Sequence, residues 1–532
     1  MNTLVITNFS GRLTRSAYGD INSGFAKYDS SYGYDPFTKP GRLTWLERPS
    51  VIGATLDFPL TMAKVRIQNA PSSVVAVYGY GPDNRLVRYN VNASGGSPDV
   101  DTGSILTAGI SGATPEIGGR MQFFGSTERI WIGHDGNVLR IDFDGANANP
   151  SVVGAASITS GVPRPSVQFL DNLYFANGTN LIEIGSAGTV LSSAKLSPGF
   201  PVGTFIRDLD LTPDGNYVQI TVSRINAISV FQEIDVHAMG STDSFVFYWN
   251  GTDATYTTFR SYAGLGLTSN TSFSDLNYLA GSDLSGTALY QNSKRILTLP
   301  NVRPPSSEAM FSIGNMVGFM APEYVSDIGQ LHASLFMYGQ YDNETPQGLY
   351  RLLQVQSSTV SVSNQTDVLK TPVCLPVSNL FYKTNTASVS GTGKMYFSTS
   401  EWIDGGSSDR GFIYKFRAVP GVLMTSVVGG VWESQNQMFS KKVKVPEVRL
   451  YTEPLVGGNQ FRIELIGSNN GSIAGGNQTF TVGTDSVVSG SDYVWYNPVI
   501  APTHTLGFRI TNLGVANWTG IKLEADVAEA GK

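Results

Sequence analysis

The stretch that most constrains the fold covers residues 172–184, where an apolar run, an Asn177-Gly178 pair and a second run of alternating apolar and polar residues follow one another. Asn-Gly accepts the positive φ angles of a tight turn, and the flanking residue types are common in β-strands. The stretch therefore predicts a β-hairpin. Tyr174 and Phe175, in its first strand, are predicted to pack within or between sheets.

Repetition of this hairpin indicates the architecture. Strand-and-turn copies recur at residues 78, 132, 175, 211 and 249, so their spacing varies between 36 and 54 residues. Repeats of roughly 40 to 50 residues with four short strands each are typical of β-propeller blades. Residues 56–434 are therefore predicted to form an irregular β-propeller of about six to eight blades. Insertions around 339–348 and 402–410 are expected in its later blades.

Composition and the last part of the chain both favour strands. Charged residues make up 15% of the sequence, against about 25% in a typical soluble domain, and the 58 glycines suit turns. Beyond residue 434, apolar residues alternate with polar or charged ones, as in 461–465 and 521–527. Because such alternation buries one face of a sheet and leaves the other in water, residues 435–532 are predicted to form a β-sandwich. The chain is predicted to be all-β.

Residues 1–55 follow neither pattern. They are rich in Gly, Tyr and Asp and offer little apolar sequence for a core, so they are predicted to be an extended N-terminal arm that lies across its own chain or a neighbouring copy. Aromatic and Arg side chains give large contact areas in such interfaces. The candidate interface residues of the arm are Tyr32, Tyr34, Arg42, Trp45 and Arg48.

Short motifs in this arm carry a resemblance to a known family. The arm contains NFSGRL at residues 8–13, then GRL at 41–43 and RP at 48–49, and it precedes the irregular propeller and the strand-rich tail. In this layout the chain resembles structural proteins of tailed bacteriophages, and it is most similar to tail tubular or nozzle-type proteins. The resemblance implies a virion protein of the tail or neck, synthesised in the host cytoplasm. It also implies a ring of copies of itself, commonly six, in contact with neighbouring tail or neck proteins.

No arrangement of residues in the sequence indicates catalysis, a cofactor or a metal site. The four histidines are far apart, and HExxH, CxxC and GxSxG motifs are absent. A glycosidase would need paired carboxylates, but carboxylates at i and i+2 most often lie on a solvated strand face or in a turn. The chain is therefore predicted not to be an enzyme, and a propeller glycoside hydrolase is the least favoured alternative. The carboxylate pairs are Asp142 with Asp144, Asp208 with Asp210, and Glu233 with Asp235.

Two of these stretches, 142–145 and 208–210, also offer oxygen ligands for calcium. Neither has the spaced Asp or Asn ligands and the terminal Glu of a calcium-binding loop. His134 lies beside Asp135-Gly136, and local hydrogen bonding in a turn is a sufficient explanation for a histidine at this position. No required metal is predicted.

A binding function is the main alternative to a role in assembly. Trp and Tyr exposed on the loops of propellers and sandwiches stack on sugar rings, so a receptor-binding or carbohydrate-binding tail-tip or fibre protein that contacts a host surface glycan also fits. Tryptophan is highly buried on average, however, and packing is the simpler expectation for each candidate. The candidates are Trp402, Trp432, Trp495 and Trp518.

The charge balance and the single cysteine exclude further classes. A net charge of −6 gives no basic track for phosphates, so sequence-specific nucleic-acid binding is not expected. The densest basic cluster, at residues 441–444, is predicted to be a solvated strand face. Cys374 is the only cysteine, which excludes an intrachain disulfide, and it is predicted to be a small buried hydrophobe.

The N-terminus lacks the basic and continuous apolar regions of a signal peptide. No apolar run approaches the 18 or more residues of a membrane span. The protein is therefore expected to be made in a cytoplasm, without a transmembrane segment.

Overall fold

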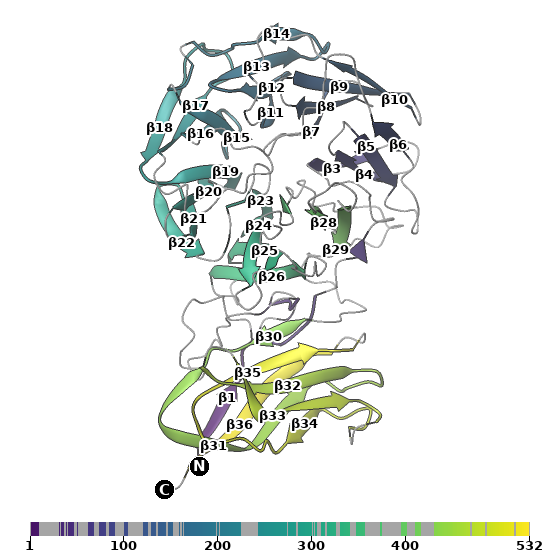
Figure 1. Ribbon diagram of the computed structural model, residues 1–532, viewed down its shortest axis with the longest axis vertical. Helices are drawn as coiled ribbons and strands as arrows, with labels where there is room; N and C mark the ends of the chain where they lie inside the picture. The colour runs from purple at the N-terminus through teal and green to yellow at the C-terminus, as the bar shows by residue number, and fades with distance from the viewer. Residues whose placement is uncertain are drawn as a thin grey trace, which may run out of the picture.

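A computed structural model of the chain describes its regular elements as β-strands, which confirms the all-β prediction (Figure 1). It describes residues 2–9, 31–46 with short gaps, 50–51, 62–68, 74–80, 85–90, 100–104, then 121–152, 159–224 and 243–356, each with short gaps, then 373–374, 395–401, 410–416, and 430–530 with short gaps at 469–470, 485–486 and 515–517.

Within these described residues, seven four-stranded antiparallel sheets are arranged around a ring and form the blades of a β-propeller (Figure 1). Seven lies within the range of six to eight blades expected from the repeats. The blades are numbered 1 to 7 in chain order: blade 1 contains β3 (Met62–Gln68), β4 (Val74–Tyr80), β5 (Arg85–Asn90) and β6 (Val100–Ser104), and blade 2 contains β7 (Met121–Phe123), β8 (Arg129–His134), β9 (Asn137–Asp144) and β10 (Asn147–Val152). Blade 3 contains β11 (Ser166–Phe169), β12 (Asn172–Asn177), β13 (Asn180–Gly185) and β14 (Val190–Ser192), blade 4 contains β15 (Phe205–Leu211), β16 (Val218–Ser223), β17 (Ser244–Trp249) and β18 (Thr257–Tyr262), and blade 5 contains β19 (Gly266–Phe273), β20 (Leu276–Asp283), β21 (Gly286–Gln291) and β22 (Lys294–Leu299). Blade 6 contains β23 (Met310–Ile313), β24 (Met316–Val325), β25 (Gln330–Gly339) and β26 (Gly348–Gln356), and blade 7 contains β27 (Val373–Cys374), β28 (Met395–Glu401) and β29 (Arg410–Phe416) together with β2 (Ser50–Val51).

The ring is closed by contacts between the inner strands of successive blades. The chain of contacts runs from β3 through β7, β11, β15, β19 and β23, and then β24 contacts β27 and β28 returns to β3. Blade 7 receives its outermost strand from the N-terminal part of the chain, because Ser50 pairs with Lys415 and Val51 with Tyr414. The first and last parts of the propeller are therefore joined within one sheet.

The predicted hairpin at residues 172–184 is present as β12 and β13 of blade 3. Asn177 is the last residue of its strand, and Gly178 has the positive φ of 63° that begins the two-residue turn. Side chains alternate between two neighbouring blades, since Tyr174 packs on Trp249 of blade 4, whereas Phe175 belongs to the same buried cluster as Trp131 of blade 2. The apolar run of β12 therefore reflects a strand that is buried on both faces, as predicted for Tyr174 and Phe175.

The C-terminal part of the chain forms a sandwich-like pair of sheets below the propeller (Figure 1). One sheet has the order β34-β31-β36-β1 and the other contains β30, β35, β32 and β33, with β31 and β35 joining the two. Apolar residues from both sheets share one core. The strands are β1 (Asn2–Ile6), β30 (Val431–Glu433), β31 (Gln437–Thr452), β32 (Gln460–Ile466), β33 (Ser472–Thr481), β34 (Tyr493–Tyr496), β35 (Thr503–Asn512) and β36 (Gly520–Glu529).

Two strands of this domain lie outside the predicted boundaries. β1 belongs to the segment predicted as an arm, and it pairs with β36 along residues 2–6. β30 precedes residue 435 and pairs with β35. Strand pairing between distant segments brings them into one sheet, which local sequence patterns do not record.

The described residues of 31–46, which we call the junction segment, lie between blade 6 and the C-terminal domain. The amide of Gly33 donates to the carbonyl of Leu352 in β26 at 2.7 Å. Trp45 and Leu352 belong to the same buried core as the C-terminal sheets. The described part of the N-terminal segment is therefore built into its own chain and connects its two domains.

Candidate functional site: the outer face of the C-terminal sheet

The sheet β34-β31-β36-β1 has one buried face and one open face. Its buried face includes Val448 and Leu450 of β31 and Leu523 and Ala525 of β36, all within the domain core. The residues between them must point outward because side chains alternate along a strand. We call the open side the outer face, and it carries Glu447, Arg449, Tyr451, Lys522, Glu524, Asp526, Tyr493 and Trp495.

Aromatic side chains occupy the β34 edge of the outer face. Tyr493 and Trp495 are 49% and 54% exposed, and they stand opposite Tyr451 and Arg449 of β31. The rings of Tyr451 and Tyr493 have centroids 6.2 Å apart. In the described part of the chain, β34 pairs only with β31, so these aromatics lie on an edge strand.

Ion pairs cover the middle of the outer face. The Arg449 guanidinium bonds Glu447 and lies 3.2 Å from Asp526, and Lys522 Nζ lies 2.7 Å from Glu524. The hydrogen bond from Lys522 is the main reason why the pKa of Glu524 is below its ordinary value, and it outweighs the opposite effect of burial. Lys522 also sits 4.3 Å from the centre of the Tyr451 ring. Ion pairs therefore hold the charged side chains of the outer face in place. Positive and negative side chains are interspersed, so the face does not carry charge of a single sign.

A pocket of about 300 Å³ opens where the N-terminal segment crosses the end of the outer face. Arg42 lies in its wall, and its Nη1 donates one long hydrogen bond of 3.4 Å to the carbonyl of Ile521. Thr452 is 2% exposed, and its hydroxyl has no hydrogen-bond partner among the residues the structure describes. The lining residues are Thr7, Arg42, Tyr451, Thr452, Asp492, Ile521 and Lys522.

An ion pair holds the junction segment beside this pocket. Lys39 Nζ lies 2.8 Å from Glu453 and also donates to Thr519 at 3.4 Å. Burial raises the pKa of Glu453, but the bonds from Lys39 and Thr519 and the charges of Lys39 and Arg42 outweigh it, so the pKa is below its ordinary value. The segment that carries Arg42 is thus tied to the C-terminal domain by charge as well as by packing.

The five candidate interface residues of the arm have different surroundings. Arg42 lies at the pocket, as described above. Tyr34 and Trp45 are 0% and 2% exposed and are buried in their own chain, where Trp45 packs on Trp518 with ring centroids 5.4 Å apart. Their aromatic area therefore joins two parts of one chain and is not open to a neighbouring copy. Tyr32 and Arg48 lie outside the described residues.

The candidate tryptophans separate clearly. Trp432 and Trp518 are 0% and 4% exposed, which agrees with the expectation of core packing, whereas Trp495 is open to solvent. Trp402 lies outside the part of the chain that the structure describes. The sequence of β34 is Tyr-Val-Trp-Tyr, so both faces of this strand carry apolar or aromatic side chains. Alternation along the strand therefore does not show, before the strand is paired, that Trp495 is on the outward face.

Two carboxylates of the candidate pairs have structural roles. Asp208 is fully buried and accepts hydrogen bonds from the Ser269 hydroxyl at 3.2 Å and from the backbone N–H of Asn270 at 2.8 Å. These bonds tie blade 4 to blade 5.

Asp142 is held between two guanidinium groups within blade 2. Its carboxylate lies 2.6 Å from Arg129 Nε and 3.0 Å from Arg140 Nε. Glu233 and Asp235, and the side chains of Asp144, His134 and Cys374, lie outside the described part of the structure. Among the residues it does describe, no three His, Cys, Asp or Glu side chains are grouped to hold a metal ion.

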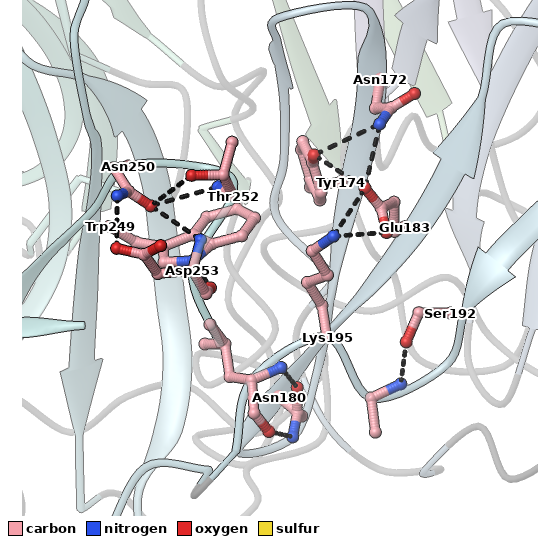
Figure 2. Close-up of polar contacts among 12 residues, drawn as sticks. Asn172, Tyr174, Asn180, Glu183, Ser192, Lys195, Trp249, Asn250, Thr252 and Asp253 are labelled. Atoms are coloured by element: carbon pink, nitrogen blue, oxygen red, sulfur yellow. Dashed lines mark hydrogen bonds and ion pairs between the residues drawn. The ribbon is translucent and has the colours of Figure 1, made fainter. Parts of the chain in front are cut away.

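A buried carboxylate in blade 3 was not anticipated from the sequence. Glu183 accepts hydrogen bonds from Asn172 at 2.9 Å and Tyr174 at 3.0 Å and pairs with Lys195 at 2.9 Å (Figure 2). Burial, together with the nearby charge of Glu183, raises the pKa of Tyr174 to about 12 against a lowering effect of the Asn172 bond. The cluster is well satisfied and joins β12, β13 and the segment after β14. The only sequence signal is a Glu between two Ile residues in a strand.

The basic cluster behaves as predicted. Lys441, Lys442 and Lys444 are exposed on β31, while Val443 and Val445 are buried. Within the described chain, no helix is long and apolar enough to cross a membrane.

Comparisons with known proteins add little to this geometry. No family model and no curated protein matches the chain. Several solved structures align with it at low similarity. The N-terminal domain of Nup159 aligns with 11% identity and a TM-score of 0.36 over 74% of this chain and 98% of that one. A chain of the nidogen/laminin complex aligns with 12% identity and a TM-score of 0.29, over 52% and 95% of the two chains.

A third solved structure is the β-propeller domain of Cps50 (Swd1) from Myceliophteria thermophila. It aligns with 10% identity and a TM-score of 0.27, over 51% of this chain and 96% of that one. Similarity this low carries no information about what the chain binds or assembles with.

Proposed function

We propose that the chain is a structural protein of a tailed-phage virion, of the tail tubular or nozzle type, which forms a ring-like part of the tail or neck through contacts between subunits. The observation that carries the proposal is the outer face of the C-terminal sheet, where Tyr493 and Trp495 are about half exposed on an edge strand. Exposed aromatic residues framed by polar groups mark interaction surfaces.

The way the two domains are joined also supports a role in assembly. The junction segment packs into a core shared by blade 6 and the C-terminal sheets. A subunit whose domains share a core transmits load as one body, which suits a component of a conduit. The carboxylates of Asp142 and Asp208 both serve as structural acceptors, so neither of them needs a catalytic explanation.

In this proposal, each subunit contacts further copies in a ring of six and neighbouring tail or neck proteins, within the virion. The N-terminal segment contributes to the ring indirectly, since β1 completes the sheet whose outer face is exposed. The net charge of −6 suits a conduit that does not retain the DNA passing through it.

The test is the mass of the purified assembly, measured by light scattering or native mass spectrometry, together with the symmetry of single-particle images. A sixfold ring that is weakened by Tyr493→Ala and Trp495→Ala is expected. Tyr217→Ala is the matched control, because Tyr217 is 43% exposed on the propeller. A monomer at all concentrations, or equal assembly of all three variants, contradicts the proposal.

The second candidate function is receptor or carbohydrate binding by a tail-tip or fibre protein, and the exposed Trp495 favours it. A trimer that binds host cells and loses binding in Trp495→Ala would support this candidate over the ring. The propeller glycoside hydrolase remains the least favoured, and hydrolysis of a host polysaccharide that is lost in Glu233→Gln or Asp235→Asn would be needed to support it.

A further inference from the structure

A lysine amine and an asparagine amide meet at one buried carboxylate in blade 3. Lys195 Nζ donates to both oxygens of Glu183, at 3.0 Å to Oε1 and 2.9 Å to Oε2. The side-chain amide of Asn172 donates to the same Oε1 at 2.9 Å (Figure 2). One oxygen atom therefore holds a potential nucleophile and a carboxamide next to each other, and the group that carries it can accept a proton.

The backbone around this cluster fixes the positions of all three side chains. Glu183 is 6% exposed and stands directly opposite Tyr174, whose hydroxyl donates to it at 3.0 Å. Asn172 lies two residues before Tyr174, so its side chain is on the same face of β12. The backbone N–H of Lys195 is bonded to the carbonyl of Leu181 at 2.9 Å. Groups that are held together in this way react as if their concentrations were very high.

The amide distinguishes this cluster from an ordinary ion pair. The described chain contains three other lysine–carboxylate pairs, and in its hydrogen bonds none of those carboxylates accepts from an Asn or Gln side chain. Charge neutralisation alone therefore does not require a carboxamide at the acceptor. The three pairs are Lys39 with Glu453, Lys441 with Glu529, and Lys522 with Glu524.

We propose that Lys195 and Asn172 react to form an isopeptide bond within blade 3, and that Glu183 is the catalytic residue of this reaction. The reaction occurs once in each chain, so it is a self-modification without turnover. It does not depend on the proposed ring or on the binding of a glycan.

The reaction begins when the Lys195 ammonium transfers a proton to Glu183 along their hydrogen bond. Burial favours this exchange because it replaces two charged groups with two neutral ones. The neutral amine attacks Cγ of Asn172, and as the new N–C bond forms, Nζ loses a second proton. Glu183 passes both protons to Nδ2, the bond between Cγ and Nδ2 breaks, and ammonium leaves. Glu183 is a carboxylate again, and no oxidant or cofactor is consumed.

The new bond closes a loop from residue 172 to residue 195, which contains β13 and β14. It ties the first residue of β12 to the segment that follows β14. In the described sheet β14 pairs with β13 alone, so it is the strand of blade 3 with a single neighbour on its outer side. A covalent loop of this kind restricts the unfolded chain and limits how far β14 can separate from its blade.

The test is the intact mass of the full chain, followed by peptide mapping. The unmodified chain should be lighter than its sequence requires by the mass of one ammonia molecule. Chymotrypsin cleaves the denatured chain after aromatic residues, and Tyr174 and Phe175 lie between the two reacting residues. The peptide that contains Asn172 should nevertheless stay attached to the peptide that contains Lys195, and fragment masses should locate the bond at these two side chains.

Two variants remove the chemistry and retain the shape of the cluster. Lys195→Arg keeps a cation beside Glu183, but a guanidinium stays protonated and is no nucleophile. Glu183→Gln keeps the size of the side chain and removes the base. Both variants should have the full mass that their sequences require and should give separate peptides. Circular dichroism shows whether each variant is folded, and Lys195→Arg is decisive if Glu183→Gln is not.

Lys441→Arg is the matched control, because Lys441 is also paired with a carboxylate, on Glu529. It should show the same loss of ammonia and the same joined peptides as the unmodified chain. A folded unmodified chain that keeps its full mass after prolonged incubation would overturn the proposal. So would a loss of ammonia that persists in Lys195→Arg. Undiminished cross-linking in folded Glu183→Gln would overturn the catalytic role of Glu183.

Discussion

Leu43 and Gly520 exchange both of their backbone hydrogen bonds, at 3.0 and 2.9 Å, and so join the N-terminal segment to the first residue of β36. This short antiparallel contact fixes the junction segment on the C-terminal domain. The junction segment also contacts blade 6, where the backbone N–H of Gly33 donates to the carbonyl of Leu352. The stability of the whole chain should therefore be sensitive to changes in the junction.

Trp45→Ala is expected to be strongly destabilising. Trp45 is 2% exposed and packs on Trp518, so its removal leaves a cavity where the domains meet. The loss should be about 3–5 kcal/mol in the free energy of unfolding, measured by denaturant titration. Trp495→Ala is the control and should change it by no more than about 0.5 kcal/mol, because Trp495 lies on the surface. Equal effects of the two changes would mean that the junction is not a packed core.

Gly430→Ala tests the close approach at the same place. A Cβ at residue 430 would lie 2.6 Å from Cε3 of Trp45 and 2.7 Å from the carbonyl oxygen of Gly33. Overpacking of this kind should lower the melting temperature and cost about 1–3 kcal/mol. Gly457→Ala is matched to it, since nothing lies within 4 Å of a Cβ there, and it should be close to neutral. A neutral Gly430→Ala would contradict the packing described for Trp45.

Acid should loosen the junction through Glu453. Its pKa in the folded chain is below the ordinary value of 4.5, so the stability that it contributes is complete above that value and is lost as the pH falls through the folded-state pKa. Thermal unfolding between pH 7 and pH 3 should show the unmodified chain losing stability more steeply than Glu453→Gln below about pH 4.5. Parallel curves for the two proteins would show that Lys39 and Glu453 do not stabilise the fold.

Glu183→Ala should destabilise blade 3. The change leaves Lys195, Tyr174 and Asn172 without their shared acceptor in a buried place, which should cost about 1–3 kcal/mol by denaturant titration. Glu529→Ala is a control of the same type, because its pair with Lys441 is about two-thirds exposed and should contribute at most about 1 kcal/mol. The prediction fails if the two substitutions have the same effect.

Local pattern was sufficient for the repeated part of the fold. The turn at Gly178 and the two-sided burial of Tyr174 and Phe175 follow from residues that are neighbours in sequence. The sequence alone did not reveal that Asn177 ends the strand and Gly178 begins the turn, because both residues are favoured in tight turns. One-residue differences of this kind depend on the register of pairing.

Local sequence patterns could not predict which strands pair when they are far apart in the chain. Nothing in residues 2–6 or 50–51 identifies β36 and β29 as their partners. For the same reason local pattern left open whether Tyr34 and Trp45 contact their own chain or a neighbouring copy, and the structure buries them in their own chain. The outer face was missed because Tyr451, Lys522 and Tyr493 come together only when three strands are in register.

The outer strand of blade 7 has a consequence for the order in which the protein can be completed. During synthesis Ser50 leaves the ribosome long before Lys415, the residue with which it pairs. The ring therefore cannot close on a growing chain until its last blade has been made, and β2 must wait without a partner. Closure of so long a segment is slow compared with the formation of each local blade. In a chain that stops before β29, the earlier blades would be complete, but the ring would stay open because β2 would have no strand with which to pair.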